Sequence, residues 1–134
     1  MSEKHYDVFL SYSPKDRPWV SEFASVLKTG GVKAWFDADI APGECWQDKI
    51  QDALRESGTL VMVLSRNNLE SLWMFFELGA AVAGKKRIIP VLPYDMDIAQ
   101  IPEALWKFQP LRESSPQEAG KRVAEVIKQD HGRL

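Results

Sequence analysis

Five consecutive apolar residues in the middle of the chain, Leu60-Val61-Met62-Val63-Leu64, constrain the fold more than any other feature. A strand without polar residues is expected to be buried on both faces, which a parallel sheet covered by helices on each side provides. Short apolar runs at 6–12, 32–36 and 87–92 predict three further strands, and a weaker strand is expected at 108–111. The sequence therefore predicts a five-stranded parallel sheet.

Segments with helical periodicity alternate with these strands. Asp16 is predicted to cap a helix, and further helices are expected over roughly 44–57, over 101–107 and at the end of the chain. Ser65-Arg66-Asn67-Asn68 is expected to lead into one more helix, which reaches about 83. Right-handed crossovers then give an α/β fold, a flavodoxin-like doubly wound five-stranded parallel sheet with helices on both faces. Pro90 suggests that the ladder of the fourth strand ends early or lies near an edge. The expected inward-facing residues of the first and last helices are Trp19, Val20, Phe23, Ala24, Leu27, Ala119, Val123, Val126 and Ile127; Trp19 and Trp35 are assigned to the core.

This topology predicts the position of a ligand site. In doubly wound sheets, ligands bind outside the carboxyl ends of the strands, where the strand order reverses. Three segments are expected around that crevice, namely Ser11 to Asp16, Asp37 to Gly43 and the residues that begin at Ser65. The topology alone does not identify the ligand.

Composition excludes several classes of function. The 134 residues predict a single domain over 1–134 with its core at about 6–127. With 17 basic and 19 acidic residues, the formal net charge of −2 gives no reason to expect a nucleic acid or a membrane surface as a partner. Cys45 is the only cysteine and the two histidines are His5 and His131, so neither a metal site nor a Cys–His pair is expected. There is no Gly-rich phosphate loop of an oxidoreductase or NTPase.

The chain is also expected to be cytoplasmic. No basic leader with a long apolar region precedes Tyr6, and the nearly uncharged stretch 72–84 is too short to span a bilayer and contains Glu77.

Three segments carry a resemblance to a known family. They are Tyr6-Asp7-Val8-Phe9-Leu10-Ser11-Tyr12-Ser13, then Asp39-Ile40-Ala41-Pro42-Gly43, and then Leu64-Ser65 followed by Ser71-Leu72-Trp73-Met74-Phe75-Phe76-Glu77-Leu78. In this order and spacing they resemble the opening strand, the BB loop and the Trp-x-x-x-Glu helix of a Toll/interleukin-1 receptor (TIR) domain. Leu105-Trp106 is a weaker match to the third conserved box of that family.

The resemblance implies an activity. Many bacterial and plant members of the family cleave NAD+ between nicotinamide and ribose, and the glutamate of the Trp-x-x-x-Glu helix is their catalytic residue; here it is Glu77. NAD+ would be the substrate and no cofactor is expected. The implied role is a prokaryotic defence effector that works by self-assembly through the BB-like loop 37–43, with a possible fused sensor domain. The alternatives are a non-enzymatic TIR–TIR interaction module and a virulence factor that imitates host TIR domains. Hydrolysis and cyclisation share the bond-breaking step and are not distinguished.

Glu77 also stands out without the resemblance, because it interrupts the apolar run 72–83. A carboxylate at the edge of a buried helix costs free energy unless it is paired or useful. The structural alternative is that it pairs with a Lys or Arg, or faces solvent. Ser13 stands where several NAD-cleaving relatives have a basic residue, and Lys15 or Arg17 would then supply a phosphate contact.

The expected substrate contacts are less specific than Glu77. For Trp46 and Trp73, a role in the core is an equal alternative. For the loop 37–43, the alternative is a plain surface turn. These contacts are Ser11, Tyr12, Ser13, Asp37, Pro42, Gly43, Trp46 and Trp73.

Overall fold

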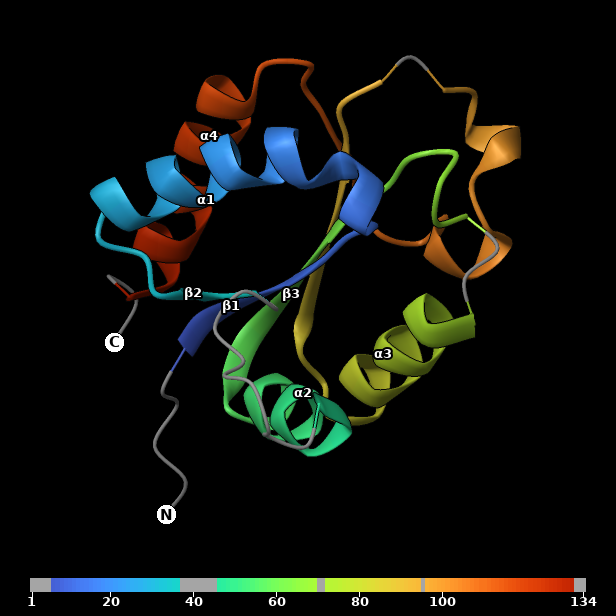
Figure 1. The fold of residues 1–134 in the computed structure, drawn as a ribbon, viewed down its shortest axis with the longest axis horizontal. Helices are drawn as coiled ribbons and strands as arrows, with labels where there is room; N and C mark the ends of the chain where they lie inside the picture. Colours follow the sequence, from blue (N-terminus) through green and yellow to red (C-terminus); the bar gives the residue numbers. More distant parts are fainter. Residues whose placement is uncertain (1–5, 37–45, 70–71, 95, 132–134) are drawn as a thin grey trace.

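A computed structural model describes residues 6–36, 46–69, 72–94 and 96–131 (Figure 1). The strands are β1 (Tyr6–Ser11), β2 (Ala34–Trp35), β3 (Ser57–Val63), β4 (Arg87–Leu92) and β5 (Leu111–Arg112). The α-helices are α1 (Arg17–Thr29), α2 (Trp46–Arg55), α3 (Leu72–Ala83) and α4 (Pro116–His131). Short 3-10 helices are η1 (Pro14–Asp16), η3 (Ile98–Gln100) and η4 (Glu103–Leu105).

The five strands form one parallel sheet in the order β2-β1-β3-β4-β5. Helices α1 and α4 cover one face of the sheet, and α2 and α3 cover the other (Figure 1). This is the flavodoxin-like doubly wound arrangement, so the predicted fold class is confirmed. The strand order reverses between β1 and β3, which makes the carboxyl ends of these two strands the expected ligand position.

Strand β3 is buried on both faces, as its sequence predicts. Successive side chains of a strand point to opposite faces. Leu60, Met62 and Leu64 accordingly join the core on the α2 and α3 side, while Val61 and Val63 join the core on the α1 and α4 side. All five are fully buried.

The segment that begins at Ser65 leads toward helix α3, as predicted, and it does so as a turn. The side chain of Asn68 accepts a hydrogen bond from the backbone N–H of Ser65 at 3.0 Å and donates one to the carbonyl of Val63 at 2.8 Å. These side-chain bonds hold the chain in a turn, because they take the place of helical backbone bonds. Helix α3 is present from Leu72, and residues 70–71 lie outside the described part.

The expectation for Pro90 is confirmed in that the proline lies near an edge of the sheet, since only the two-residue strand β5 lies beyond β4. Strand β4 lies between β3 and β5, and Pro90 pairs with Met62 of β3. The Val91 carbonyl accepts from Leu64 on the β3 side, whereas the Leu92 carbonyl accepts from Glu113 on the β5 side. Groups alternate along the strand, so the missing N–H of Pro90 faces β5, whose ladder starts only at the Val91–Leu111 pair. The proline therefore removes no ladder bond.

The two tryptophans assigned to the core differ. Trp35 is buried and stacks on Phe9 with 4.9 Å between ring centroids. Trp19 is only half-buried at the rim of the α1 side, where its indole N–H donates to the carbonyl of Ser114. The core assignment is confirmed for Trp35 and in part for Trp19. Trp19 packs against the core of the α1 and α4 side and stacks on Phe23 with 5.3 Å between ring centroids, while its N–H bonds at the rim.

Helix α4 packs on α1 along a strip of small and branched side chains. Ala119, Val123 and Ile127 are buried as predicted, whereas Val126 is half-buried. Within the described residues, no helix combines the length and the apolar character that a bilayer crossing requires.

Candidate active site

The end of β1 brings Ser11 against Glu77. Alternation along the strand directs Val8 and Leu10 to the α1 and α4 face, and Phe9 and Ser11 to the face covered by α3. The Ser11 hydroxyl donates a hydrogen bond to Glu77 Oε1 at 2.7 Å. The exposed fractions are 5% for Ser11 and 3% for Glu77, so the bond lies in a largely water-free environment.

Burial changes the acidity of Glu77. It raises the pKa of this carboxyl from 4.5 to about 7, because removal from water disfavours the charged form; the hydrogen bond from Ser11 opposes the rise. The sequence left two structural alternatives for Glu77, a pair with a lysine or arginine and exposure to solvent, and the described residues support neither. Glu77 is not solvent-facing, and its partner among the described residues is a neutral hydroxyl rather than a lysine or an arginine.

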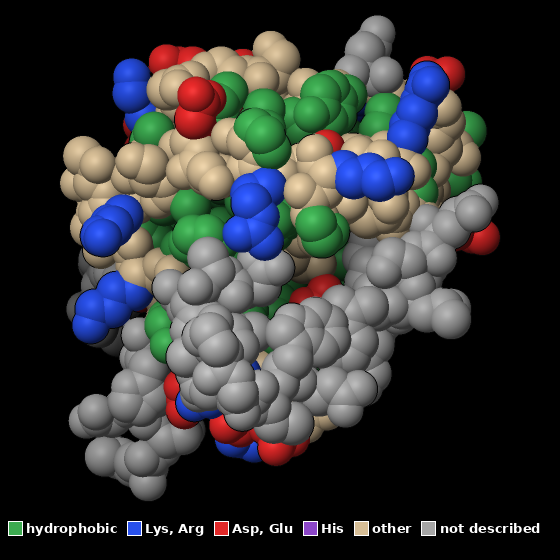
Figure 2. All heavy atoms as spheres, viewed as in Figure 1, with side chains coloured by type: hydrophobic (Ala, Val, Ile, Leu, Met, Phe, Trp, Pro, Cys, Tyr) green, Lys and Arg blue, Asp and Glu red, His purple; other side chains and the backbone are tan. Residues whose placement is uncertain are grey.

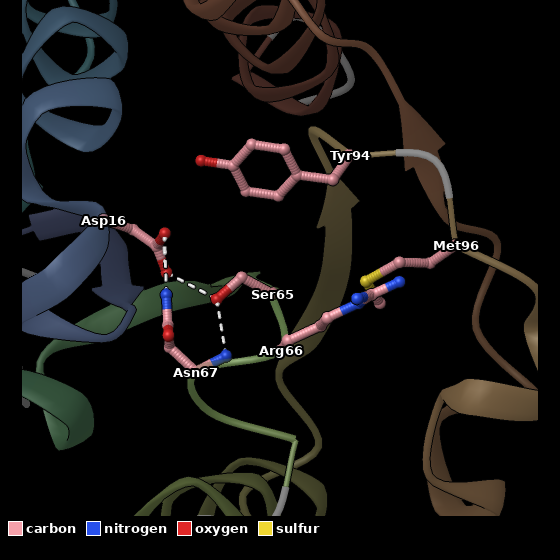
Figure 3. Close-up of a pocket in the computed structure, with 6 residues that line it drawn as sticks. All are labelled: Asp16, Ser65, Arg66, Asn67, Tyr94 and Met96. Carbon is pink, nitrogen blue, oxygen red and sulfur yellow. Dashed lines mark hydrogen bonds between the residues drawn. The ribbon is translucent and has the colours of Figure 1, made fainter.

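A second polar cluster joins the loops that follow β1 and β3. Asp16 Oδ2 accepts a hydrogen bond from the Ser65 hydroxyl at 2.5 Å, and Asp16 Oδ1 accepts one from the Asn67 amide at 3.3 Å (Figure 3). Asp16 and Ser65 are both buried. The cluster thus bridges the switch point of the sheet, and the predicted meeting of the Ser11–Asp16 and Ser65 segments is confirmed.

The sequence predicted that Asp16 caps α1, but its side chain does not do so. It occupies the N-cap position, but its carboxylate makes no capping hydrogen bond. The carboxylate is instead directed to Ser65 and Asn67 of the β3 loop. Two charge-assisted bonds across the switch point replace one local bond to the helix backbone.

A hollow of about 330 Å³ opens beside this cluster (Figure 3). It is lined by Asp16, Ser65, Arg66, Asn67, Tyr94 and Met96. Partial burial raises the pKa of the Tyr94 hydroxyl above its usual value of 10.0, and the negative charge of Asp16 and a hydrogen bond to it act in the same direction.

The other strand-end residues predicted as contacts have local roles in the structure. Tyr12 packs against the core on the α1 and α4 side, so its side chain leaves β1 on the face opposite to Glu77. Ser13 is buried, and its hydroxyl caps η1 by accepting the backbone N–H of Lys15 at 3.3 Å. The geometry brings Ser11 to Glu77 and does not bring these two side chains to it.

The remaining predicted residues cannot be placed against Glu77. Asp37, Pro42, Gly43 and Cys45 lie outside the described residues, as does the whole BB-like loop. Trp46 begins α2 and Trp73 lies in the first turn of α3, but their side chains are outside what the structure describes. Among the described residues, no group of three His, Cys, Asp or Glu side chains is arranged to hold a metal ion.

Sequence reasoning missed the parts of Asp16, Asn67 and Tyr94 in the cluster. One signal was available for Asn67, since polar residues directly follow the fully apolar third strand. Asp16 was interpreted as a local cap because that pattern explains an aspartate before a helix. Tyr94 carries no local signal, since its place depends on how the β4 loop packs on the loop after β1.

Comparison with known proteins places these features in a family. The family model described as TIR domain matches residues 8–124. The relatives that are similar to the chain include three with names that refer to NAD+ or cyclic ADP-D-ribose. The probable 2′ cyclic ADP-D-ribose synthase TcpO of Methanobrevibacter olleyae is 27% identical over 106 residues, 75% of this chain and 31% of the relative. The 2′ cyclic ADP-D-ribose synthase AbTIR of Acinetobacter baumannii is 32% identical over 96 residues, 67% of this chain and 36% of the relative.

The third relative is the NAD(+) hydrolase TcpC of Escherichia coli, 29% identical over 80 residues, 58% of this chain and 26% of the relative. The chain thus spans about a third of the length of the curated relatives it matches. Among solved structures, the TIR domain of the Toll-related receptor TRR-2 of Hydra magnipapillata is similar with a TM-score of 0.71, 25% identity and 96% coverage of both chains. The match over nearly the whole chain shows that it belongs to the TIR domain family.

Proposed function

We propose that the chain cleaves NAD+ at the bond between nicotinamide and ribose, with Glu77 as the catalytic carboxylate. The observation that carries the proposal is the buried Glu77 side chain beside the carboxyl end of β1, held by the Ser11 hydroxyl at 2.7 Å. The relatives named as cyclic ADP-D-ribose synthases and as an NAD(+) hydrolase support the same chemistry.

The reaction suits a single carboxylate. As the carbon–nitrogen bond breaks, the electron pair leaves with nicotinamide, which departs neutral and needs no proton donor. Positive charge develops on the ribose, and an ionised Glu77 stabilises that charge through space. In hydrolysis, a water molecule then adds to the ribose carbon and releases a proton. In cyclisation, a ribose hydroxyl of the same molecule adds and releases its proton.

The raised pKa of Glu77 gives the reaction a pH dependence. Only the ionised form of Glu77 stabilises the developing charge, and burial raises its pKa to about 7 in the free protein. The value of kcat/KM, which reports the free enzyme, is therefore expected to rise as the pH passes through about 7.

The test is incubation of the protein with NAD+, with chromatography of nicotinamide and of the ADP-ribose products. Glu77→Gln is expected to lower the rate about a hundredfold or more, because it removes the charge and nearly keeps the shape. Glu125→Gln on the exposed side of α4 is the matched control and is expected to keep the parent rate. An unchanged rate in Glu77→Gln would show that Glu77 is not the catalytic residue.

The product distinguishes hydrolysis from cyclisation, which share the first bond-breaking step. Linear ADP-ribose indicates attack by water, and a cyclic product indicates attack by a ribose hydroxyl. Relatives of both kinds exist, so product analysis on this chain decides between them.

The setting follows from the family resemblance. A prokaryotic defence effector in the cytoplasm, activated by self-assembly through the loop 37–43 and by a fused sensor domain, fits a domain that spans about a third of its curated relatives. If no condition yields nicotinamide and a Pro42 substitution abolishes assembly, the chain is an interaction module instead.

A further inference from the structure

The hollow beside Asp16 is lined by polar side chains that have no part in the proposed reaction at Glu77. Asp16 is 5% exposed, yet its carboxylate gathers polar side chains from two other segments, namely Ser65 and Asn67 after β3 and Tyr94 after β4. Ser65 Oγ in turn accepts the backbone N–H of Asn67 at 3.1 Å. These bonds fix the directions of the hydroxyl and amide groups along one wall of the hollow.

The remaining wall offers a cation and an aromatic ring. The Arg66 side chain is exposed and extends along the hollow toward Met96, across from Tyr94 (Figure 3). Within the described part of the chain, no carboxylate forms an ion pair with Arg66. Tyr94 is 47% exposed, so part of its ring is open to a ligand, whereas Met96 is buried.

A second hollow, of about 350 Å³, is lined by residues of η1 and α1, by Tyr94 and by Pro116. Asp16 and Tyr94 line both hollows, and Lys15 lines the second one. Figure 2 shows Lys and Arg side chains and apolar patches interspersed on one face of the molecule. The two hollows bring a cation, the Tyr94 ring and the buried Asp16 carboxylate together.

We infer that the hollow lined by Arg66, Tyr94 and Asp16 binds a nucleotide, within this one chain and without Glu77. Arg66 receives a phosphate, because a guanidinium forms paired hydrogen bonds with phosphate oxygens. The base stacks on the exposed part of the Tyr94 ring, and Ser65 and Asn67 receive the ribose hydroxyls. A volume of about 330 Å³ lies within the range of small-molecule sites.

The position agrees with this assignment. The Asp16–Ser65 bond crosses the β1/β3 switch point, where sheets with this strand order bind their ligands. Asp16 also gives up the capping bond that its place before α1 would provide. Such departures from a local rule are expected where a group serves a site rather than the stability of its own helix.

Calorimetric titration of the chain with ADP tests the inference. Arg66→Ala is expected to weaken ADP binding about tenfold or more, and to leave the weak binding of adenosine unchanged, because adenosine has no phosphate. Arg122→Ala, which removes an exposed arginine from α4, is the matched control and should bind ADP like the parent. Tyr94→Phe keeps the ring and should retain most of the binding, whereas Tyr94→Ala should lose it.

Two outcomes overturn the inference. One is the absence of ADP binding to the parent at millimolar concentration, and the other is equal ADP binding by the parent and Arg66→Ala, with the fold of each variant checked by its amide NMR spectrum. Glu77→Gln should bind ADP like the parent, so this test remains valid even if no NAD+ cleavage is found.

The source of the nucleotide follows from competition. If ADP inhibits nicotinamide release competitively, the hollow holds the adenosine diphosphate part of NAD+ itself. If ADP binds and the rate responds in another way or not at all, the hollow is a separate nucleotide site. Both results support the site, and they differ only in its occupant.

Discussion

A buried carboxyl group such as Glu77 makes the stability of the fold depend on pH. Its pKa is about 7 in the folded chain against 4.5 for the free side chain, and burial is the main cause. The folded state therefore holds the proton over a range in which the unfolded state has lost it. The stability that this group contributes is complete below about pH 4.5 and is lost as the pH rises through about 7.

Glu77→Gln is expected to remove this pH dependence, because the amide does not titrate. The free energy of unfolding of the parent, relative to the variant, should fall by about 2–3 kcal/mol between pH 5 and pH 8. Urea unfolding at both pH values measures the difference, and Glu125→Gln should show no such change. A parent-to-variant difference that is constant with pH would contradict the raised pKa. Ser11→Ala should extend the loss to higher pH, because the bond from Ser11 lowers the pKa.

At the scale of elements, the contact between α1 and α4 depends on Gly120. A methyl group at this position would lie 2.7 Å from both Cβ and Cγ1 of Val26 and 3.2 Å from the carbonyl oxygen of Phe23. The two helices are therefore closer there than any other residue at position 120 permits. This contact sets how closely α4 packs on α1 beside Phe23 and Val26.

Gly120→Ala is expected to lower the free energy of unfolding by about 1–3 kcal/mol through overpacking. Gly79→Ala on α3 is the control, since a methyl group there would meet nothing within 4 Å. The control should raise stability by up to about 1 kcal/mol through helix propensity. Denaturant titration of both variants checks the pair, and a Gly120→Ala variant as stable as the parent would show that the helices can separate at little cost.

At the scale of the whole molecule, the proposed activity should depend on assembly. The resemblance implies that the loop 37–43 of one subunit completes the site of a neighbour. The rate of nicotinamide release is then expected to rise more steeply than linearly with protein concentration. Initial rates and light scattering across the same concentration range measure this, with Pro42→Ala as the variant that should return the dependence to linear. A rate strictly proportional to concentration in the parent would indicate a site complete in one chain.

The sequence by itself determined the fold class and the identity of the candidate carboxylate. The apolar run Leu60 to Leu64 requires burial on both faces, and five alternating strands and helices leave few topologies that satisfy it. The glutamate within an apolar helix was visible for the same reason, because a charge among buried residues breaks the pattern. These inferences depend on periodicity, which is a local property of the chain.

Only the tertiary structure decided which polar groups meet. The Ser11–Glu77 bond joins residues 66 positions apart, and the Asp16–Ser65 bond joins residues 49 positions apart. A local pattern assigned Asp16 to the cap of α1, yet the stronger bonds came from the neighbouring loop. The raised pKa of Glu77 likewise follows from burial by the packed sheet and helices. Hydrogen bonds and desolvation between distant segments arise only when strands pair, which is why the sequence could locate the site but not arrange it.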